Sequence, residues 1–162
     1  MIYLDHNATT PLSPAAIDAM QPWLGVAANP FSAHRLGRSA AAAVDRARAQ
    51  VGALLGWPRE GVIFTAGATE ANATALHVGR WRVSAVEHPS VLAWSDHVLP
   101  VDAAGRVRLD ALAEPGALDG FTGLSVMLAN NETGVVQPIA EVAALARRAG
   151  VLLHVDASQA PG

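Results

Sequence analysis

The apolar residues of this chain gather in short runs on consecutive positions, and longer stretches with helical spacing separate these runs. A strand that is apolar at every position is buried on both faces, which is typical of a parallel sheet with helices on each side. Alternation of such strands with helices predicts an α/β fold with right-handed crossovers. The expected strands are residues 62–64, 83–86, 98–101, 124–129 and 151–155.

The clearest helical pattern covers residues 36–55, where apolar positions recur every three or four residues and Gly56 follows as a stop signal. A second helix is expected to begin at Pro138 and to end before Gly150, because proline suits the first turn of a helix and glycine the position after its last turn. Weaker helical patterns cover residues 69–78 and 109–118.

Composition excludes several classes of protein. A chain of 162 residues with 51% hydrophobic and only 15% charged residues is expected to fold around a core. The net charge of −3 and the absence of a basic cluster argue against a nucleic-acid partner. The six histidines show no ligand spacing and no cysteine accompanies them, so we expect no metal site. No apolar run approaches the length of a membrane span and no targeting signal is recognisable, which predicts a cytoplasmic protein without a membrane partner.

A turn of small residues follows the expected strand at 62–64 and opens the next helix at Ala68 and Thr69. Exposed N–H groups at such a helix start form a site for an anionic phosphate. A glycine-containing turn capped by threonine is also an ordinary structural device, and this alternative is the more common one for a single turn.

Polar side chains also follow three of the other expected strands, at the edge where α/β proteins bind ligands. They are His88, Asn131, Asp156 and Gln159. Taken one at a time, each has an ordinary structural explanation: a histidine that only packs and hydrogen-bonds, amides in a turn, and a carboxylate that caps a turn. Together with the anion-binding helix start, one imidazole, the amides and one carboxylate match what a phosphorylated pyridine cofactor requires.

The chain resembles the pyridoxal-phosphate-dependent cysteine desulfurases of the class V aminotransferase group. Six blocks in family order carry the resemblance: YLDHNATTPLSP, NPFSAHRLGR, VIFTAGATEANATAL, EHPSV, ANNETGVVQPI and HVDASQ. The resemblance implies an α/β three-layer sandwich with a mainly parallel sheet, as in the large domain of the aspartate aminotransferase-like (fold type I) enzymes, incomplete at the C-terminus. It also implies an N-terminal segment with a short helix at residues 1–35, near the substrate entrance, and the first part of the cofactor-binding domain at residues 36–162.

The same resemblance implies roles for single residues at a pyridoxal 5'-phosphate site. Ala68 and Thr69 would contact the phosphate of the cofactor. His88 would stack on the pyridine ring and assist the chemistry. Asp156 would pair with the protonated pyridine nitrogen, and Gln159 would hydrogen-bond the phenolic oxygen.

For the substrate, the resemblance implies L-cysteine, which such enzymes convert to L-alanine and a protein persulfide for iron-sulfur cluster or thio-cofactor assembly. Asn131 would lie beside the phenolic oxygen and the substrate. The residues expected near the substrate entrance, without an assigned chemical step, are Asn7, Thr9, Asn29 and His34. A sulfur-acceptor protein would be a partner, and the complete enzyme would be a homodimer.

All 11 basic residues of the chain are arginines, and the chain contains no cysteine. The resemblance implies that the Schiff-base lysine and the persulfide cysteine belong to a missing half after Gly162, so we expect the isolated chain to be inactive. Two alternatives stay open. One is a sister class V lyase or aminotransferase, such as selenocysteine lyase or cysteine sulfinate desulfinase, and the other is a non-catalytic half-subunit that needs a C-terminal partner.

Overall fold

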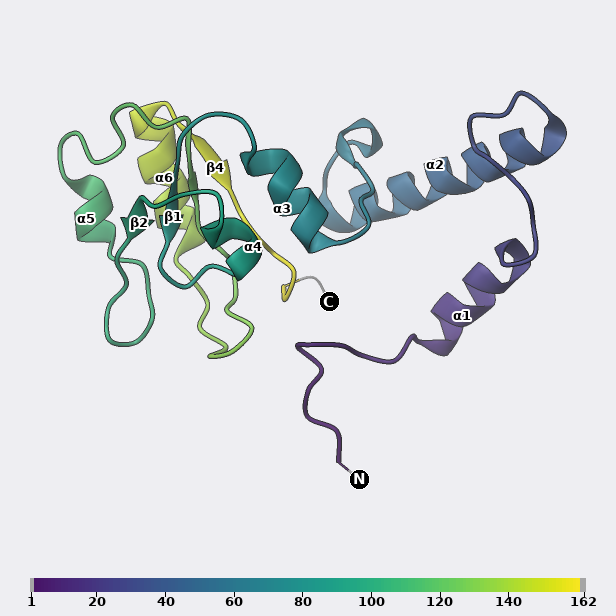
Figure 1. The fold of residues 1–162 in the computed structure, drawn as a ribbon, viewed down its shortest axis with the longest axis horizontal. Helices are drawn as coiled ribbons and strands as arrows, with labels where there is room; N and C mark the ends of the chain where they lie inside the picture. Colours follow the sequence, from purple (N-terminus) through teal and green to yellow (C-terminus); the bar gives the residue numbers. More distant parts are fainter. Residues whose placement is uncertain (1, 161–162) are drawn as a thin grey trace. The chain divides into compact units, whose positions relative to one another are not determined.

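The computed structural model describes residues 2–160, which fall into two units (Figure 1). The first unit combines residues 2–8 with residues 65–160 and contains the sheet. The second unit is Thr9–Phe64 and is helical.

The first unit is built on a four-stranded parallel sheet in the order β2-β1-β3-β4. The strands are β1 (Trp81–Ser84), β2 (Val98–Leu99), β3 (Gly123–Ser125) and β4 (Leu152–His154). They lie at four of the five predicted runs, so these predictions are confirmed. From β1 the chain moves outward to β2, then returns to β3 on the other side of β1 and continues to β4. The strand order therefore reverses between β1 and β3, which is where open α/β sheets bind ligands.

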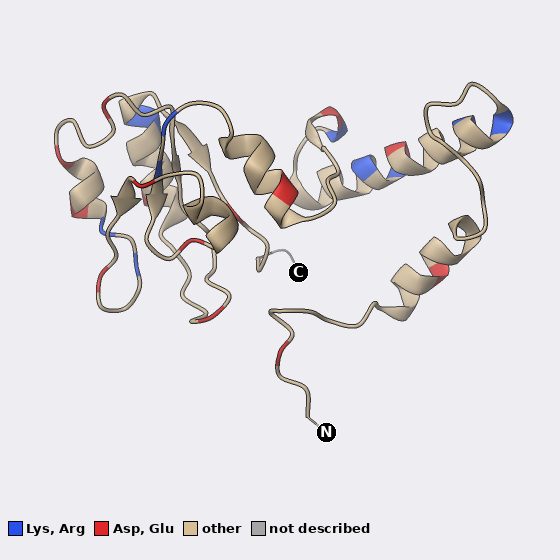
Figure 2. Cartoon of the chain, in the orientation of Figure 1, with Lys and Arg blue, Asp and Glu red and all other residues tan. Residues whose placement is uncertain are grey.

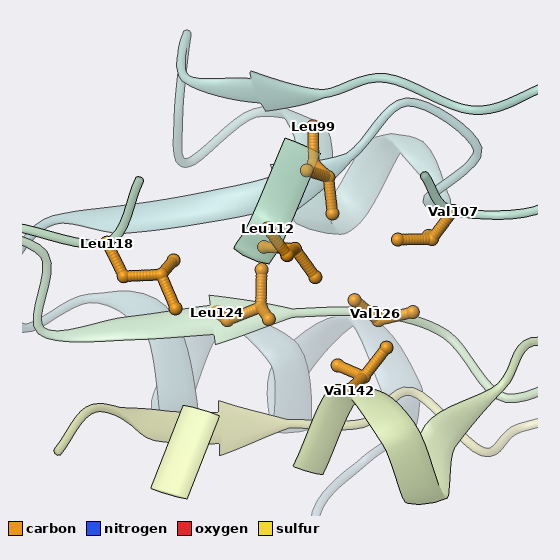
Figure 3. Packing of buried hydrophobic residues seen from close by; sticks show 7 residues of the cluster. All are labelled: Leu99, Val107, Leu112, Leu118, Leu124, Val126 and Val142. Carbon is orange, nitrogen blue, oxygen red and sulfur yellow. The ribbon is translucent and has the colours of Figure 1, made fainter. Parts of the chain in front are cut away.

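Helices cover both faces of this sheet. They are α3 (Ala68–Leu76), α4 (Pro89–Leu92), α5 (Leu109–Ala113) and α6 (Ile139–Ala149). On one face, Leu76 and Val91 from α3 and α4 pack with Trp81 and Val83 of β1. On the other face, side chains from α5, α6, β2 and β3 form a larger core, which Figure 3 shows: Leu99, Val107, Leu112, Leu118, Leu124, Val126 and Val142. The central strands β1 and β3 are buried on both faces, as expected for the middle layer of three.

Helix α6 forms where the sequence predicts it. Pro138 is the N-cap residue, and Gly150 ends the helix in the left-handed conformation with φ of 69°. Val142 and Ala146 are four residues apart, both are buried, and they form the face that packs on the sheet.

The second unit contains α1 (Pro14–Met20), a 3-10 turn at Gln21–Trp23, α2 (Arg35–Leu55) and another 3-10 turn at Arg59–Gly61. The Nδ1 atom of His34 caps α2 by accepting from the Gly37 N–H, and Gly56 ends the helix, as the sequence predicts. The charged side chains of α2 are arginines except for one aspartate, Asp45 (Figure 2). Within the described residues only Gly37, Ala40 and Gly52 of this helix are buried. The middle of its apolar stripe is half-buried, and Leu36, Leu54 and Leu55 near its ends are exposed.

Two expected elements are absent or shorter among residues 2–160. Residues 62–64 form no strand, and Ile63 is 79% exposed, because no described segment pairs with this one. The helix expected at 109–118 ends at Ala113, since Pro115 disfavours helical geometry in the residue before it and Gly116 turns the chain with φ of 79°.

None of the helices in residues 2–160 combines the length and the hydrophobicity that crossing a bilayer requires.

Candidate functional site

A cavity of about 760 Å³ opens in the first unit, at the carboxyl ends of β1, β3 and β4 and beside the start of α3. Its volume falls within the range of about 300–1,000 Å³ that is typical of small-molecule sites. All six side chains expected at the cofactor line it: Ala68, Thr69, His88, Asn131, Asp156 and Gln159. The predicted residues therefore lie together, as expected where strand ends converge at one edge of a parallel sheet.

The start of α3 forms one side of the cavity. Gly67 is the N-cap residue and supplies no side-chain hydrogen bond to the first turn of the helix. A Cβ atom built on Gly67 would meet no atom within 4 Å, so the backbone here borders open space. Glu70 accepts from the Ala66 N–H through Oε2 at 2.6 Å, which fixes the turn that leads into the helix.

Asp156 follows β4 and is 7% exposed. Its Oδ1 accepts from the N–H and the hydroxyl of Ser158 at 3.0 and 2.6 Å, and its Oδ2 accepts from Asn72 Nδ2 at 2.8 Å. Burial acts to raise the pKa of Asp156, but the hydrogen bonds from Ser158 and Asn72 outweigh it and hold the pKa below its ordinary value. Asp156 is therefore an anion at neutral pH, and no salt bridge within residues 2–160 involves it.

A hydrogen-bonded chain links Asp156 to His88. Asn72 Nδ2 donates to Asp156 and also to Ser90 Oγ, at 3.0 Å. Ser90 Oγ lies 2.8 Å from His88 Nδ1, and the Ser90 N–H donates to the same nitrogen at 3.1 Å. Because His88 is the N-cap residue of α4, these bonds fix its imidazole on the cavity wall.

Asn7 ties the N-terminal segment to the cavity. Its Nδ2 donates to the carbonyl oxygen of Asn131 at 3.0 Å, and its own carbonyl oxygen accepts from Gln159 Nε2 at 3.0 Å. Asn7 therefore lies at the cavity, and its place near a substrate entrance stays a prediction. Thr9, Asn29 and His34 belong to the second unit, and their place near an entrance stays a prediction.

Sequence reasoning missed several residues that shape this site. Asn72 and Ser90 connect the charged group to the imidazole, and Met127 contributes to the cavity lining. The contact between Ser158 and Asp156 could have been predicted, because Asp-x-Ser is typical of a turn in which the aspartate accepts a hydrogen bond from the backbone N–H two residues later. Among residues 2–160, no three histidine, cysteine, aspartate or glutamate side chains gather closely enough to hold a metal ion.

Comparisons with known proteins agree with this geometry. A curated cysteine desulfurase of Gluconacetobacter diazotrophicus is 42% identical over 99% of this chain and 45% of its own length. One from Cereibacter sphaeroides is 43% identical over 99% of this chain and 46% of its own length. The chain thus spans about half the length of the curated relatives it matches.

Solved structures agree on the fold. The NifS-like protein of Rickettsia africae superposes with a TM-score of 0.88 at 32% identity, over 96% of this chain and 47% of its own. A structure described as SspA in complex with cysteine gives a TM-score of 0.88 at 27% identity, over 99% of this chain and 51% of its own. The predicted fold class is confirmed. A family model described as aminotransferase class-V matches residues 2–162, and the chain therefore belongs to the class-V aminotransferase family.

Proposed function

We propose that the cavity binds pyridoxal 5'-phosphate and that the whole protein is a cysteine desulfurase, of which this chain corresponds to the N-terminal half. One observation carries the proposal: a buried, anionic Asp156 held by neutral donors shares a cavity with the uncapped start of α3. A carboxylate that lacks a cationic partner suits a protonated ring nitrogen, and a helix start suits a phosphate.

The described residues fit this cofactor. The N–H groups at Ala68 and Thr69 would hold the phosphate, and Asp156 would hold the ring nitrogen in its protonated form. His88 would lie against the ring, while Gln159 and Asn131 would face its phenolic oxygen. When bound, the cofactor supplies an electron sink for reactions at the carbon next to an amino group. The chain's residues supply position, charge and a wall that reduces the access of water.

Gly67 offers a direct test of the phosphate site. Replacing Gly67 by valine should weaken binding of pyridoxal 5'-phosphate by about tenfold or more, because the new side chain would occupy open space beside the helix start. Isothermal titration calorimetry should show a much smaller effect on pyridoxal, which lacks the phosphate. Gly25→Val is the matched control, since an added Cβ at Gly25 also meets no atom within 4 Å and Gly25 does not line the cavity. Equal losses for both ligands would contradict the phosphate assignment.

L-cysteine as the substrate, a sulfur-acceptor protein and a homodimer are parts of the proposal for the whole protein. The curated relatives named cysteine desulfurases, at about 40% identity, favour this activity over the sister lyases. The structural neighbour described in complex with cysteine supports the same substrate.

The 162-residue chain by itself should be inactive. It contains no lysine and no cysteine, so it has no side chain for covalent attachment of the cofactor or for a persulfide. Mixing the purified chain with pyridoxal 5'-phosphate and L-cysteine should release no sulfide or alanine above the level that the free cofactor gives. The Gluconacetobacter relative, assayed in parallel, is the positive control. Turnover by the chain alone would contradict the roles assigned to the missing residues.

A further inference from the structure

A second buried carboxyl group lies beneath the cavity, on the residue directly before His88. Glu87 follows β1 and is 5% exposed. Its Oε1 accepts from the Ser84 hydroxyl at 2.7 Å and from the Met127 N–H at 2.6 Å. Its Oε2 is buried and has no hydrogen-bond partner among the described residues. None of the proposed cofactor contacts involves Glu87.

One of the two hydrogen bonds of Oε1, the bond from the Met127 N–H, joins the segments that follow the neighbouring strands β1 and β3, while the bond from Ser84 is local. Ser84 ends β1, and Met127 lies just after β3. A further bond between these segments runs from Asn130 Nδ2 to the Val86 carbonyl oxygen at 3.0 Å. Since Met127 and His88 both line the cavity, Glu87 lies where it can fix two parts of the cavity wall against each other.

In the part of the chain that the structure describes, Glu87 has no cationic partner. No salt bridge within residues 2–160 involves it, and its donors are a hydroxyl and a backbone amide. Asp156 is the titratable group whose charge acts on Glu87. Two histidines belong to the same region: His88 is the next residue in the chain, and His154 Nδ1 lies 2.8 Å from Ser125 Oγ. Burial lowers the pKa of His154, so this ring is neutral at pH 7 and supplies no positive charge.

The negative charges of two neighbouring buried carboxylates repel each other, so charging both without a cation nearby has a high free-energy cost. Asp156 receives three hydrogen bonds over both of its oxygens, whereas the Oε2 atom of Glu87 receives none. Burial is also the main cause that raises the pKa of Glu87, and Asp156 raises it further, while Ser84, Met127 and Ser125 act in the opposite direction. Of the two carboxyl groups, Glu87 is therefore the one that more readily holds a proton, and Asp156 the one that more readily holds the charge.

We infer that Glu87 is a positioning residue that carries a proton on Oε2 and, as a neutral acid, fixes His88 and Met127 on the cavity wall. The buried negative charge is thereby left to Asp156, where a cationic ring nitrogen would need it. This role in ligand binding rests on the proposed function, but the protonation of Glu87 does not.

The first test is a spectroscopic one. Infrared spectra of the folded, ligand-free chain at pH 7 should contain the C=O stretching band of a protonated carboxylic acid. The band should be absent in Glu87→Gln and present in Glu114→Gln, a control that removes an exposed glutamate outside the cavity. A spectrum in which Glu87→Gln removes no such band would overturn the inference.

The second test compares two replacements of Glu87. Glutamine keeps a carbonyl oxygen that accepts from Ser84 and Met127 and is neutral like the protonated acid, so its unfolding midpoint at pH 7 should be no lower than that of the wild type. Alanine leaves the Met127 N–H without this acceptor and should lower the midpoint and weaken binding of pyridoxal 5'-phosphate. A glutamine variant that fails to fold, or that is destabilised as much as the alanine variant, would overturn the inference.

The third test uses pH. In the unfolded chain a glutamate has a pKa of about 4.3. The folded pKa of Glu87 is higher, so rising pH removes the proton from the unfolded chain first and favours unfolding until the folded pKa is passed. The wild type should therefore lose stability relative to Glu87→Gln as pH rises from about 4.3 to the folded pKa of Glu87, and parallel stability curves would contradict the assignment.

The outcomes separate this inference from the proposed function. If the infrared band is present but pyridoxal 5'-phosphate does not bind, the proposed function fails and the protonated Glu87 stands. If the cofactor binds to a chain without the band, the inference about Glu87 fails alone.

Discussion

Replacing Asp156 by alanine should reduce the affinity of the chain for pyridoxal 5'-phosphate by about 100-fold or more. Removing one partner of a buried charge pair costs about 3–5 kcal/mol, because the other charge is left without compensation. The change should also lower the free energy of unfolding by about 1–3 kcal/mol, since Asn72 is buried and would lose its carboxylate acceptor. Titration of the chain with the cofactor, and urea unfolding without it, measure the two effects separately.

Asparagine at position 156 distinguishes charge from shape. Asp156→Asn keeps an oxygen that can accept from Ser158 but removes the negative charge, so it should lose most of the affinity and less of the stability. Asp102→Asn is a matched control, because Asp102 Oδ1 also accepts from two backbone N–H groups, those of Ala104 and Arg106, on an exposed turn. If Asp156→Asn binds the cofactor as tightly as the wild type, the pairing of Asp156 with the ring nitrogen is wrong.

Replacing Leu124 by alanine should lower the free energy of unfolding by about 2–5 kcal/mol, the range for large-to-small changes in a packed core. Leu124 is 0% exposed and lies in the larger hydrophobic cluster between β3 and the helices α5 and α6 (Figure 3). Because β3 leads directly to Met127 and Asn131, loosening this strand should also disturb the cavity. Urea unfolding followed by circular dichroism measures the loss.

Leu152 provides the control for this second prediction. It lies on β4 of the same sheet but is 62% exposed, so Leu152→Ala should change the free energy of unfolding by no more than about 0.5 kcal/mol. Similar losses for Leu124→Ala and Leu152→Ala would mean that the cluster is not the main core of the first unit.

Much of the first unit could be predicted from the sequence, because its strands and helices are each marked by a pattern of neighbouring residues. Runs of consecutive apolar residues indicate strands buried on both faces, and four of the five runs are parallel strands. The fifth, residues 62–64, fails because a strand also needs a partner, which composition cannot reveal. The shortened α5 could have been predicted, since Pro115 and Gly116 interrupt the helical pattern.

The candidate site, too, could be predicted only in part from the sequence. The position of His88, Asn131 and Asp156 at one edge follows from strand direction alone. The bond from Asn72 to Asp156 joins residues 84 positions apart in the chain, and Glu87 reaches Met127 across 40 positions. Such contacts depend on how helices and strands pack in space, so no local pattern predicts them.

The bonds around Ser90 decide which nitrogen of the His88 ring carries its hydrogen. Since Asn72 donates to Ser90 Oγ, the hydroxyl hydrogen of Ser90 is free to point at Nδ1 of His88, and the Ser90 amide points at the same atom. Nδ1 thus accepts twice, and the neutral imidazole is the Nε2–H tautomer. A molecule that lies against this edge of the ring meets a hydrogen-bond donor rather than a lone pair, so His88 would select for acceptor atoms there.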